Sequence, residues 1–153
     1  MKNLILTLLI LFSGIAISQT VVFENGTYFQ NGIAYTGNYT TYFENGIIKE
    51  VLSVKDGKLN GEFIKNYESG QKLETGNYEN NLKFGLWTRY SITGTTLAKA
   101  SYLNGKKNGA WFVYNEHGTQ LFEMNYKNGE KTGIWNQWDE SGTLIKTTNF
   151  SSL

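Results

Sequence analysis

The amino-acid sequence predicts an all-β protein, in the form of an elongated, single-layer antiparallel sheet of tandem 24-residue β-hairpin repeats. Three observations predict this fold class. Glycines recur every 24 residues, aromatic residues keep fixed positions relative to them, and Asn-Gly or Asp-Gly pairs punctuate the units. The absence of proline agrees, because a sheet ladder needs every backbone N–H.

The repeat is defined by columns of equivalent residues. The first glycines of the units are Gly37, Gly61, Gly85, Gly109 and Gly133. The aromatic residues two positions later are Tyr39, Phe63, Trp87, Trp111 and Trp135. The second glycines are Gly46, Gly70, Gly94, Gly118 and Gly142. Near the end of each unit come Val54, Tyr78, Tyr102, Tyr126 and Phe150. These columns stay in phase through all units, which predicts one structural unit repeated without insertion.

Two kinds of turn separate the strands. Asp56-Gly57, Asn104-Gly105 and their equivalents suit type I′ hairpin turns, in which both central residues have positive φ. Asn80-Asn81 suits the same turn, since asparagine tolerates the left-handed region. The second glycine marks the turn at the other side. Between the turns we expect two strands per unit, for example 111–114 and 121–126.

The chain divides into three segments. Residues 1–18 have a positive start, an apolar run and a small-x-small end, which predicts a signal peptide cleaved near Ser18-Gln19. The mature protein is then exported, to the periplasm or outside the cell. Residues 19–36 are predicted to form N-terminal capping strands, because they hold a degenerate unit. Residues 37–153 hold the five repeats.

The types of residue in the chain argue against catalysis and against metal or cofactor binding. The formal net charge of +1 gives no general attraction to nucleic acid, and the chain has no cysteine. The single histidine, His117, lies in a turn column, and the acidic residues recur in one column of the repeat. We therefore predict no enzyme activity, no catalytic residues, no metal site and no cofactor.

The aromatic columns supply a candidate binding surface. Equivalent side chains recur every ~9.6 Å, two strands apart, so the first aromatic column should form a ladder along one side of the sheet. Packing between units and an open surface for a protein or a glycan both remain possible. The candidate surface consists of Trp87, Tyr90, Trp111, Tyr114, Trp135 and Trp138.

Charge separates toward the two long edges of the predicted ribbon. The turns near the second glycine carry Glu44, Glu68, Glu116, Asp139 and Glu140. The opposite turns are rich in lysine, and we predict a basic edge at Lys83, Lys106, Lys107 and Lys131. Such an edge could attract an anionic lipid or glycan surface in a salt-sensitive way.

The last predicted strand, residues 143–150, leaves one edge of the sheet unpaired. A free edge can pair with another chain, so self-association or strand addition by a partner is possible here.

The unit written Gly109-Ala110-Trp111 … Tyr126-Lys127-Asn128-Gly129 resembles the MORN repeat (membrane occupation and recognition nexus) in its bacterial variant form. The resemblance covers about residues 26–150. It implies an elongated, twisted sheet of hairpins and roles in protein contact, scaffolding or membrane association. Some bacterial relatives are labelled antitoxins of toxin–antitoxin pairs.

Three functions follow as hypotheses. The first is a non-enzymatic, exported protein-interaction or scaffolding surface in the cell envelope. The second is a glycan-binding module that uses the aromatic ladder as a stacking platform. The third, implied by the resemblance alone, is an antitoxin-like partner of a toxin protein.

Overall fold

The computed structural model describes residues 20–150, so the predicted signal peptide at 1–18 lies outside the described residues. The described residues form thirteen strands. They are β1 Val21–Glu24, β2 Thr27–Gln30, β3 Ile33–Ala34, β4 Gly37–Tyr42, β5 Ile48–Lys55, β6 Lys58–Asn66, β7 Lys72–Glu79, β8 Leu82–Tyr90, β9 Thr96–Leu103, β10 Lys106–Tyr114, β11 Gln120–Lys127, β12 Glu130–Trp138 and β13 Leu144–Phe150.

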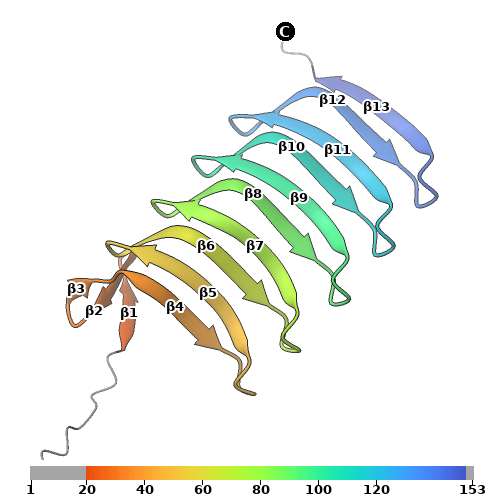
Figure 1. Ribbon diagram of the computed structural model, residues 1–153. Helices are drawn as coiled ribbons and strands as arrows, with labels where there is room; N and C mark the ends of the chain where they lie inside the picture. The colour runs from red at the N-terminus through yellow and green to blue at the C-terminus, as the bar shows by residue number, and fades with distance from the viewer. Residues whose placement is uncertain (1–19, 151–153) are drawn as a thin grey trace, which may run out of the picture.

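The main sheet is an open ribbon of ten antiparallel strands, β4 to β13, in chain order. Each strand pairs with the strands before and after it in the sequence, and β4 and β13 form the two ends (Figure 1). The strands are arched across the width of the ribbon (Figure 1). The predicted fold class, an elongated single-layer sheet of hairpin repeats, is confirmed.

The two kinds of turn have the conformations that their residues favour. Asp56 and Gly57 both have positive φ, 50° and 77°, as a type I′ turn requires, and Asn80 and Asn81 do the same at 50° and 69°. At the other edge, the Gly46 N–H donates to the carbonyl of Phe43, and only the glycine has positive φ. The type I′ prediction is therefore confirmed for both the glycine and the asparagine versions.

In the second to fifth units, the first glycine lies inside a strand, where the ladder is irregular. In β10, Lys107 pairs with Tyr102 and Trp111 pairs with Ala100, so three residues face the single residue Ser101. Gly109 lies in this bulge with φ 98°, a conformation that glycine adopts without the Cβ penalty. Similar irregularities occur in β6, β8 and β12. The strand therefore runs from 106 to 114, longer than the predicted 111–114.

A separate three-stranded sheet, β1-β2-β3, lies against the start of the ribbon within the segment predicted as a cap. The backbone N–H of Tyr28 donates to the carbonyl of Gly57, and the N–H of Gly57 donates to the carbonyl of Tyr35. The Tyr28 side chain is buried beside Leu52 and Val54. The first hairpin of the ribbon is thus covered on one face by β2.

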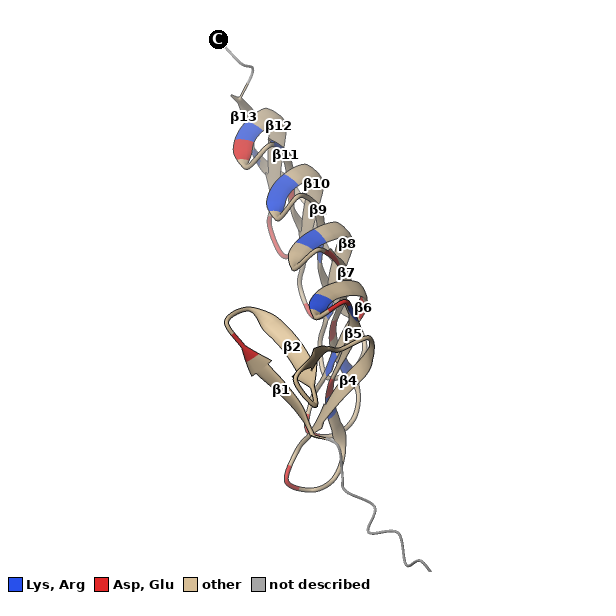
Figure 2. Ribbon diagram, turned by 90° about the vertical axis from the view of Figure 1, so that its left-hand side faces the viewer, with Lys and Arg blue, Asp and Glu red and all other residues tan. Residues whose placement is uncertain are grey.

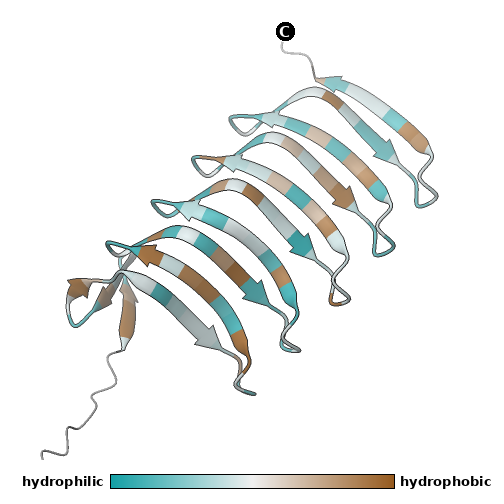
Figure 3. Ribbon diagram, in the orientation of Figure 1, coloured by the Kyte–Doolittle hydropathy of each residue, from teal (hydrophilic) through white to brown (hydrophobic). Residues whose placement is uncertain are grey.

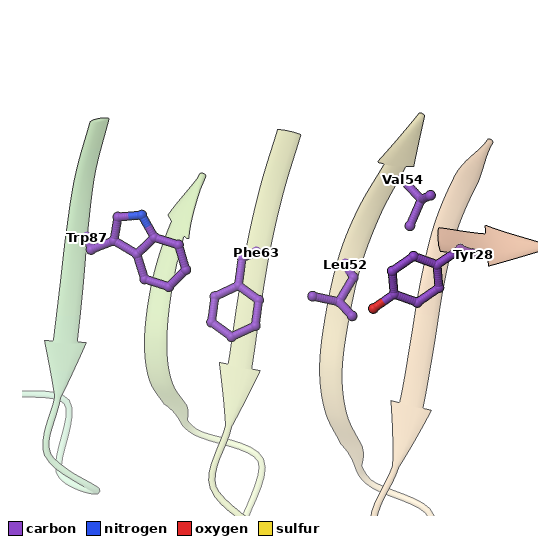
Figure 4. Close-up of a cluster of buried hydrophobic side chains, with 5 residues drawn as sticks. All are labelled: Tyr28, Leu52, Val54, Phe63 and Trp87. Atoms are coloured by element: carbon purple, nitrogen blue, oxygen red, sulfur yellow. The ribbon is translucent and has the colours of Figure 1, made fainter. Parts of the chain in front are cut away.

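The buried core is small and lies toward the N-terminal end of the ribbon. Figure 4 shows the five buried hydrophobic side chains, which come from β2, β5, β6 and β8. Trp87 is the most buried of them, with 2% of its surface exposed. Elsewhere, hydrophobic and hydrophilic residues are interspersed along the strands over the whole ribbon (Figure 3). A single-layer sheet has no second layer to cover it, so most of its apolar side chains are only half-buried.

Candidate interaction surface

The six aromatic residues of the predicted binding surface divide between the two faces of the sheet. Successive side chains of a strand point to opposite faces, and Trp111 and Tyr114 are separated by an odd number of positions in β10. The ring of Tyr114 accordingly lies 6.5 Å from that of Phe112, two residues before it. We call the side that carries Trp87, Trp111 and Trp135 the tryptophan face. The opposite face carries Tyr90, Tyr114 and Trp138.

On the tryptophan face, the rings form a continuous series along the ribbon. Trp111 lies between Tyr102 and Tyr126, with ring centroids 5.3 Å away from each. Tyr126 continues to Trp135 at 5.1 Å, and Trp135 continues to Phe150 at 4.8 Å. Each tryptophan therefore packs against the late aromatic residues of its own unit and the preceding unit. Such cross-strand aromatic pairs stabilise a sheet.

Each indole N–H of the tryptophan face donates to a backbone carbonyl of the preceding strand. Nε1 of Trp111 donates to the carbonyl of Ser101 at 3.0 Å, and Nε1 of Trp135 donates to the carbonyl of Asn125 at 3.0 Å. Trp87 bonds to Asn77 in the same way at 3.1 Å. Each acceptor residue lies at or directly beside the irregular stretch of the ladder. The tryptophans are therefore held in one orientation by both packing and a hydrogen bond.

Three of the four predicted edge lysines lie over these rings. Nζ of Lys107 is 4.2 Å from the ring centroid of Trp111 and 4.7 Å from that of Tyr126. Lys83 lies over Trp87 at 3.6 Å, and Lys131 lies over Trp135 at 4.6 Å. Lys106 instead begins β10 at the Asn-Gly turn and is exposed. The lysine and tryptophan columns thus form one composite surface, in which ammonium groups cover aromatic rings.

Charge on the tryptophan face changes along the ribbon. Toward the N-terminal end, Lys65 pairs with Glu50 at 2.8 Å, and Lys83 lies 3.8 Å from Glu74. Within β10 to β13 the only acidic residues are Glu123, whose side chain points to the opposite face, and Glu130 at a turn. In the C-terminal half of this face the cations form no ion pair among the described residues, and Glu130 is the acidic residue beside Lys131 at the turn. These cations are Lys107, Lys131 and Lys146.

The Asn-Gly turn edge carries recurring lysines. Figure 2 looks onto this edge and shows Lys or Arg residues at corresponding places in successive hairpins. The acidic residues predicted for the other edge lie in or beside the turns there, and Glu44, Glu116 and Glu140 are exposed. The Ser141 hydroxyl and the backbone N–H of Thr143 donate to the Asp139 carboxylate, and these bonds lower its pKa.

The described residues contain no cluster of three or more His, Cys, Asp or Glu side chains that could hold a metal ion. His117 is an exposed turn residue whose backbone N–H donates to Oδ1 of Asn115. Between residues 20 and 150 there is no helix of the length and hydrophobicity needed to cross a membrane.

The placement of lysine over tryptophan is the feature that sequence reasoning missed. The signal was present, because Lys83, Lys107 and Lys131 each stand four positions before a tryptophan of the same strand. An even separation places two side chains of a regular strand on one face, and the bulge keeps this relation, because Lys107 and Trp111 pair with Tyr102 and Ala100, which are two positions apart in β9. The sequence-based prediction assigned these lysines to an edge of the ribbon and did not relate them to the aromatic ladder.

The model of the MORN repeat variant family matches residues 35–56 and 59–80. The two matched segments contain the hairpins β4-β5 and β6-β7, and the hairpins that follow continue the same residue spacing. A search of curated proteins found no match. MORN repeats are generally modules that bind proteins or membranes, and they are typically not enzymes.

Proposed function

We propose that this chain, a MORN repeat protein, is an exported, non-catalytic interaction module that holds an acidic protein partner on its tryptophan face. The contact surface is the C-terminal half of that face, from β10 to β13. In this role the ribbon serves as a scaffold in the cell envelope. Its repeats supply a long, regular surface for contact with another protein.

The observation that carries the proposal is the array of lysines in β10 to β13, which lie on the tryptophan face and form no ion pair among the described residues. Lys107 and Lys131 lie over Trp111 and Trp135, and Lys146 lies on the same face. Exposed cations attract an acidic partner in a salt-sensitive way. Aromatic side chains beneath them supply the kind of contact that dominates interface energies.

The same geometry favours a protein over a glycan. Stacking on a sugar requires an open ring face. The Trp111 ring is flanked by Tyr102 and Tyr126, with the ammonium of Lys107 above it. An acidic protein that displaces or contacts the lysine ammonium groups fits this arrangement better than a sugar ring does. An antitoxin-like role would be a special case of the same surface, with the toxin as the acidic partner.

A charge-reversal experiment tests the proposal. The double variant Lys107→Glu, Lys131→Glu reverses two cations of the tryptophan face. The control variant Lys99→Glu, Lys127→Glu reverses two exposed cations elsewhere and gives the same net charge. We expect one stoichiometric partner to co-purify from an envelope extract with the wild type and the control. The tryptophan-face variant should lose that partner, and salt should weaken binding to the wild type. Equal capture by both variants would contradict the proposal.

Export has its own test. The mature protein purified from its native host should begin at Gln19, as measured by intact mass. A cytoplasmic chain that retains Met1 would contradict export. It would not decide whether the tryptophan face is the contact surface, because the charge-reversal experiment tests that claim separately.

A further inference from the structure

The tryptophan face has a hollow of about 200 Å³ at its C-terminal end, over β11, β12 and β13. Its apolar lining comes from Phe122, Met124, Trp135 and Phe150, and its polar lining comes from Lys131, Asn136, Gln137, Lys146 and Thr148. It lies within the contact surface proposed above.

The hollow arises because the last unit departs from the pattern of the unit before it. Gln137 and Thr148 stand where the preceding unit has Val113 and Met124, and Lys146 stands where it has Phe122. Each replacement puts a polar side chain at an apolar position. In the preceding unit these positions hold half-buried apolar side chains, whereas in the last unit the hollow has an apolar side and a side with polar and cationic groups.

The size and chemistry of the hollow indicate what it can hold. Small-molecule sites typically span roughly 300–1,000 Å³, so this hollow is smaller than most of them. Its size suits a single apolar side chain that inserts from a partner, as interface anchors do. Lys131 and Lys146 belong to no ion pair among the described residues, so a carboxylate beside the inserted side chain would find cations on this surface.

We propose that this hollow is an anchor site for one aromatic side chain of the partner, flanked in the partner's sequence by Asp or Glu. The inference rests on the proposed function and gives it a recognition rule. The aromatic ring enters between Met124 and Trp135, and the flanking carboxylate lies toward Lys146 and Lys131. The partner segment is thus recognised by its aromatic residue and by the acidic residue next to it in sequence.

Three short peptides test this recognition rule. Their binding is followed by NMR, as chemical-shift changes of the isotope-labelled mature protein. The probe Ac-Glu-Phe-Glu-amide should shift the Trp135 indole signal and the Lys146 and Thr148 amides. Replacing its Phe with Ala removes the inserted ring, so the affinity should fall roughly tenfold to a hundredfold. The peptide Ac-Lys-Phe-Lys-amide should cause no saturable shifts at this site.

The sharpest variant fills the hollow. Thr148→Met gives the last unit the residue that the preceding unit has at Met124, so the fold should tolerate it. The matched control is Thr147→Met, which adds the same side chain to the opposite face, where Thr147 bonds to Asn136. We expect Thr148→Met to weaken the probe peptide at least about tenfold and Thr147→Met to leave it unchanged. Equal binding by both variants would overturn the anchor site.

The result also separates the anchor site from the proposed function. If the partner is lost with Lys107→Glu, Lys131→Glu but bound equally by both methionine variants, the interaction surface stands and the anchor site is wrong. If the peptides cause no shifts while phosphatidylglycerol vesicles bind wild type and Thr148→Met alike, the surface recognises lipid and the anchor site is again wrong.

Discussion

At the scale of single residues, the most constrained position is Gly76 in β7. Gly76 lies opposite Phe63 in the sheet, and a Cβ atom built there would overlap the ring of Trp87. The equivalent positions in other units hold Leu52, Ala100, Met124 and Thr148. The absence of a Cβ at Gly76 therefore lets the Trp87 ring lie against the β7 backbone, and Trp87 is the most buried side chain of the core.

We predict that Gly76→Ala lowers the free energy of unfolding by about 1–3 kcal/mol, the usual cost of overpacking a filled site. The matched variant is Ala100→Gly, one unit later, where Trp111 already accommodates alanine. It should cost only about 0.5–1 kcal/mol, because glycine weakens a strand. Denaturant unfolding monitored by tryptophan fluorescence measures both. A Gly76→Ala variant as stable as the wild type would contradict the packing described for Trp87.

Asp139 provides a pH-dependent contact at a turn. Hydrogen bonds, chiefly from the Ser141 hydroxyl and then from the Thr143 backbone N–H, lower the pKa of its carboxyl group. A lowered folded-state pKa means that the contribution to stability is present above the unfolded pKa of about 3.9. That contribution is lost as the pH falls through the folded pKa.

We therefore expect the amide signals of Ser141 and Thr143 to titrate with a midpoint below the ordinary aspartate value. In Asp139→Asn this transition should disappear while the turn persists. The preceding unit has a neutral Asn115 at the same position, and its side chain accepts the equivalent bonds from His117 and Thr119. A midpoint at or above the ordinary aspartate value would contradict the hydrogen bonding at this turn.

At the scale of the elements, the turns were predictable and the strand interiors were not. Asp56-Gly57 and Asn80-Asn81 identify their turn type because few residues tolerate positive φ at both central positions. The bulge at Gly109 was not predicted, since a glycine column alone does not distinguish a turn from an irregular strand. The odd spacing of Trp111 and Tyr114 predicts side chains on opposite faces of the sheet, but the sequence-based prediction assigned both residues to one surface.

Asn81 shows how a departure from the repeat can connect elements. Its Oδ1 accepts a bond from the Leu59 N–H at 2.7 Å, and its Nδ2 donates to the carbonyl of Gly26 at 3.2 Å. Gly26 lies in the turn between β1 and β2. The asparagine that replaces the usual glycine therefore links the second unit of the ribbon to the N-terminal sheet.

We predict that Asn81→Gly speeds amide hydrogen exchange in residues 21–30. The overall stability should change by less than about 1 kcal/mol, because easier turn formation offsets the lost bonds. Gly105→Asn, the reciprocal change one unit later, is the control and should leave residues 21–30 unaffected. Unchanged exchange of this segment in Asn81→Gly would show that the bond to Gly26 does not hold the N-terminal sheet.

At the scale of the whole molecule, stability should vary along the ribbon. Within the ribbon each strand pairs only with its neighbours, as in other repeat architectures, and the buried core lies between β2 and β8. The two end strands differ: Tyr28 packs on Tyr39 of β4 with ring centroids 5.3 Å apart, whereas β13 has only β12 beside it. Local opening should therefore begin at the C-terminal end.

Hydrogen exchange measured by mass spectrometry should accordingly show the strongest protection in β5 to β8 and weaker protection in β13 than in β4. The free edge of β13 is also where the predicted self-association or strand addition would occur. Equal protection of all ten strands would contradict a nearest-neighbour ribbon, and strong protection of β13 at high protein concentration alone would indicate self-association.

The central claim is that the tryptophan face is the contact surface, and adjacent residues of β12 test it most directly. Both Gln137 and Asn136 border the hollow, but successive side chains of a strand point to opposite faces, and the Asn136 side chain accepts a bond from Thr147 on the face away from Trp135. A photo-crosslinking amino acid is placed at one position or the other in the full-length protein expressed in its host, and partner adducts are compared. We predict an adduct of one protein from position 137 and none from position 136. Adducts from 136 alone, or equally from both, would contradict the claim.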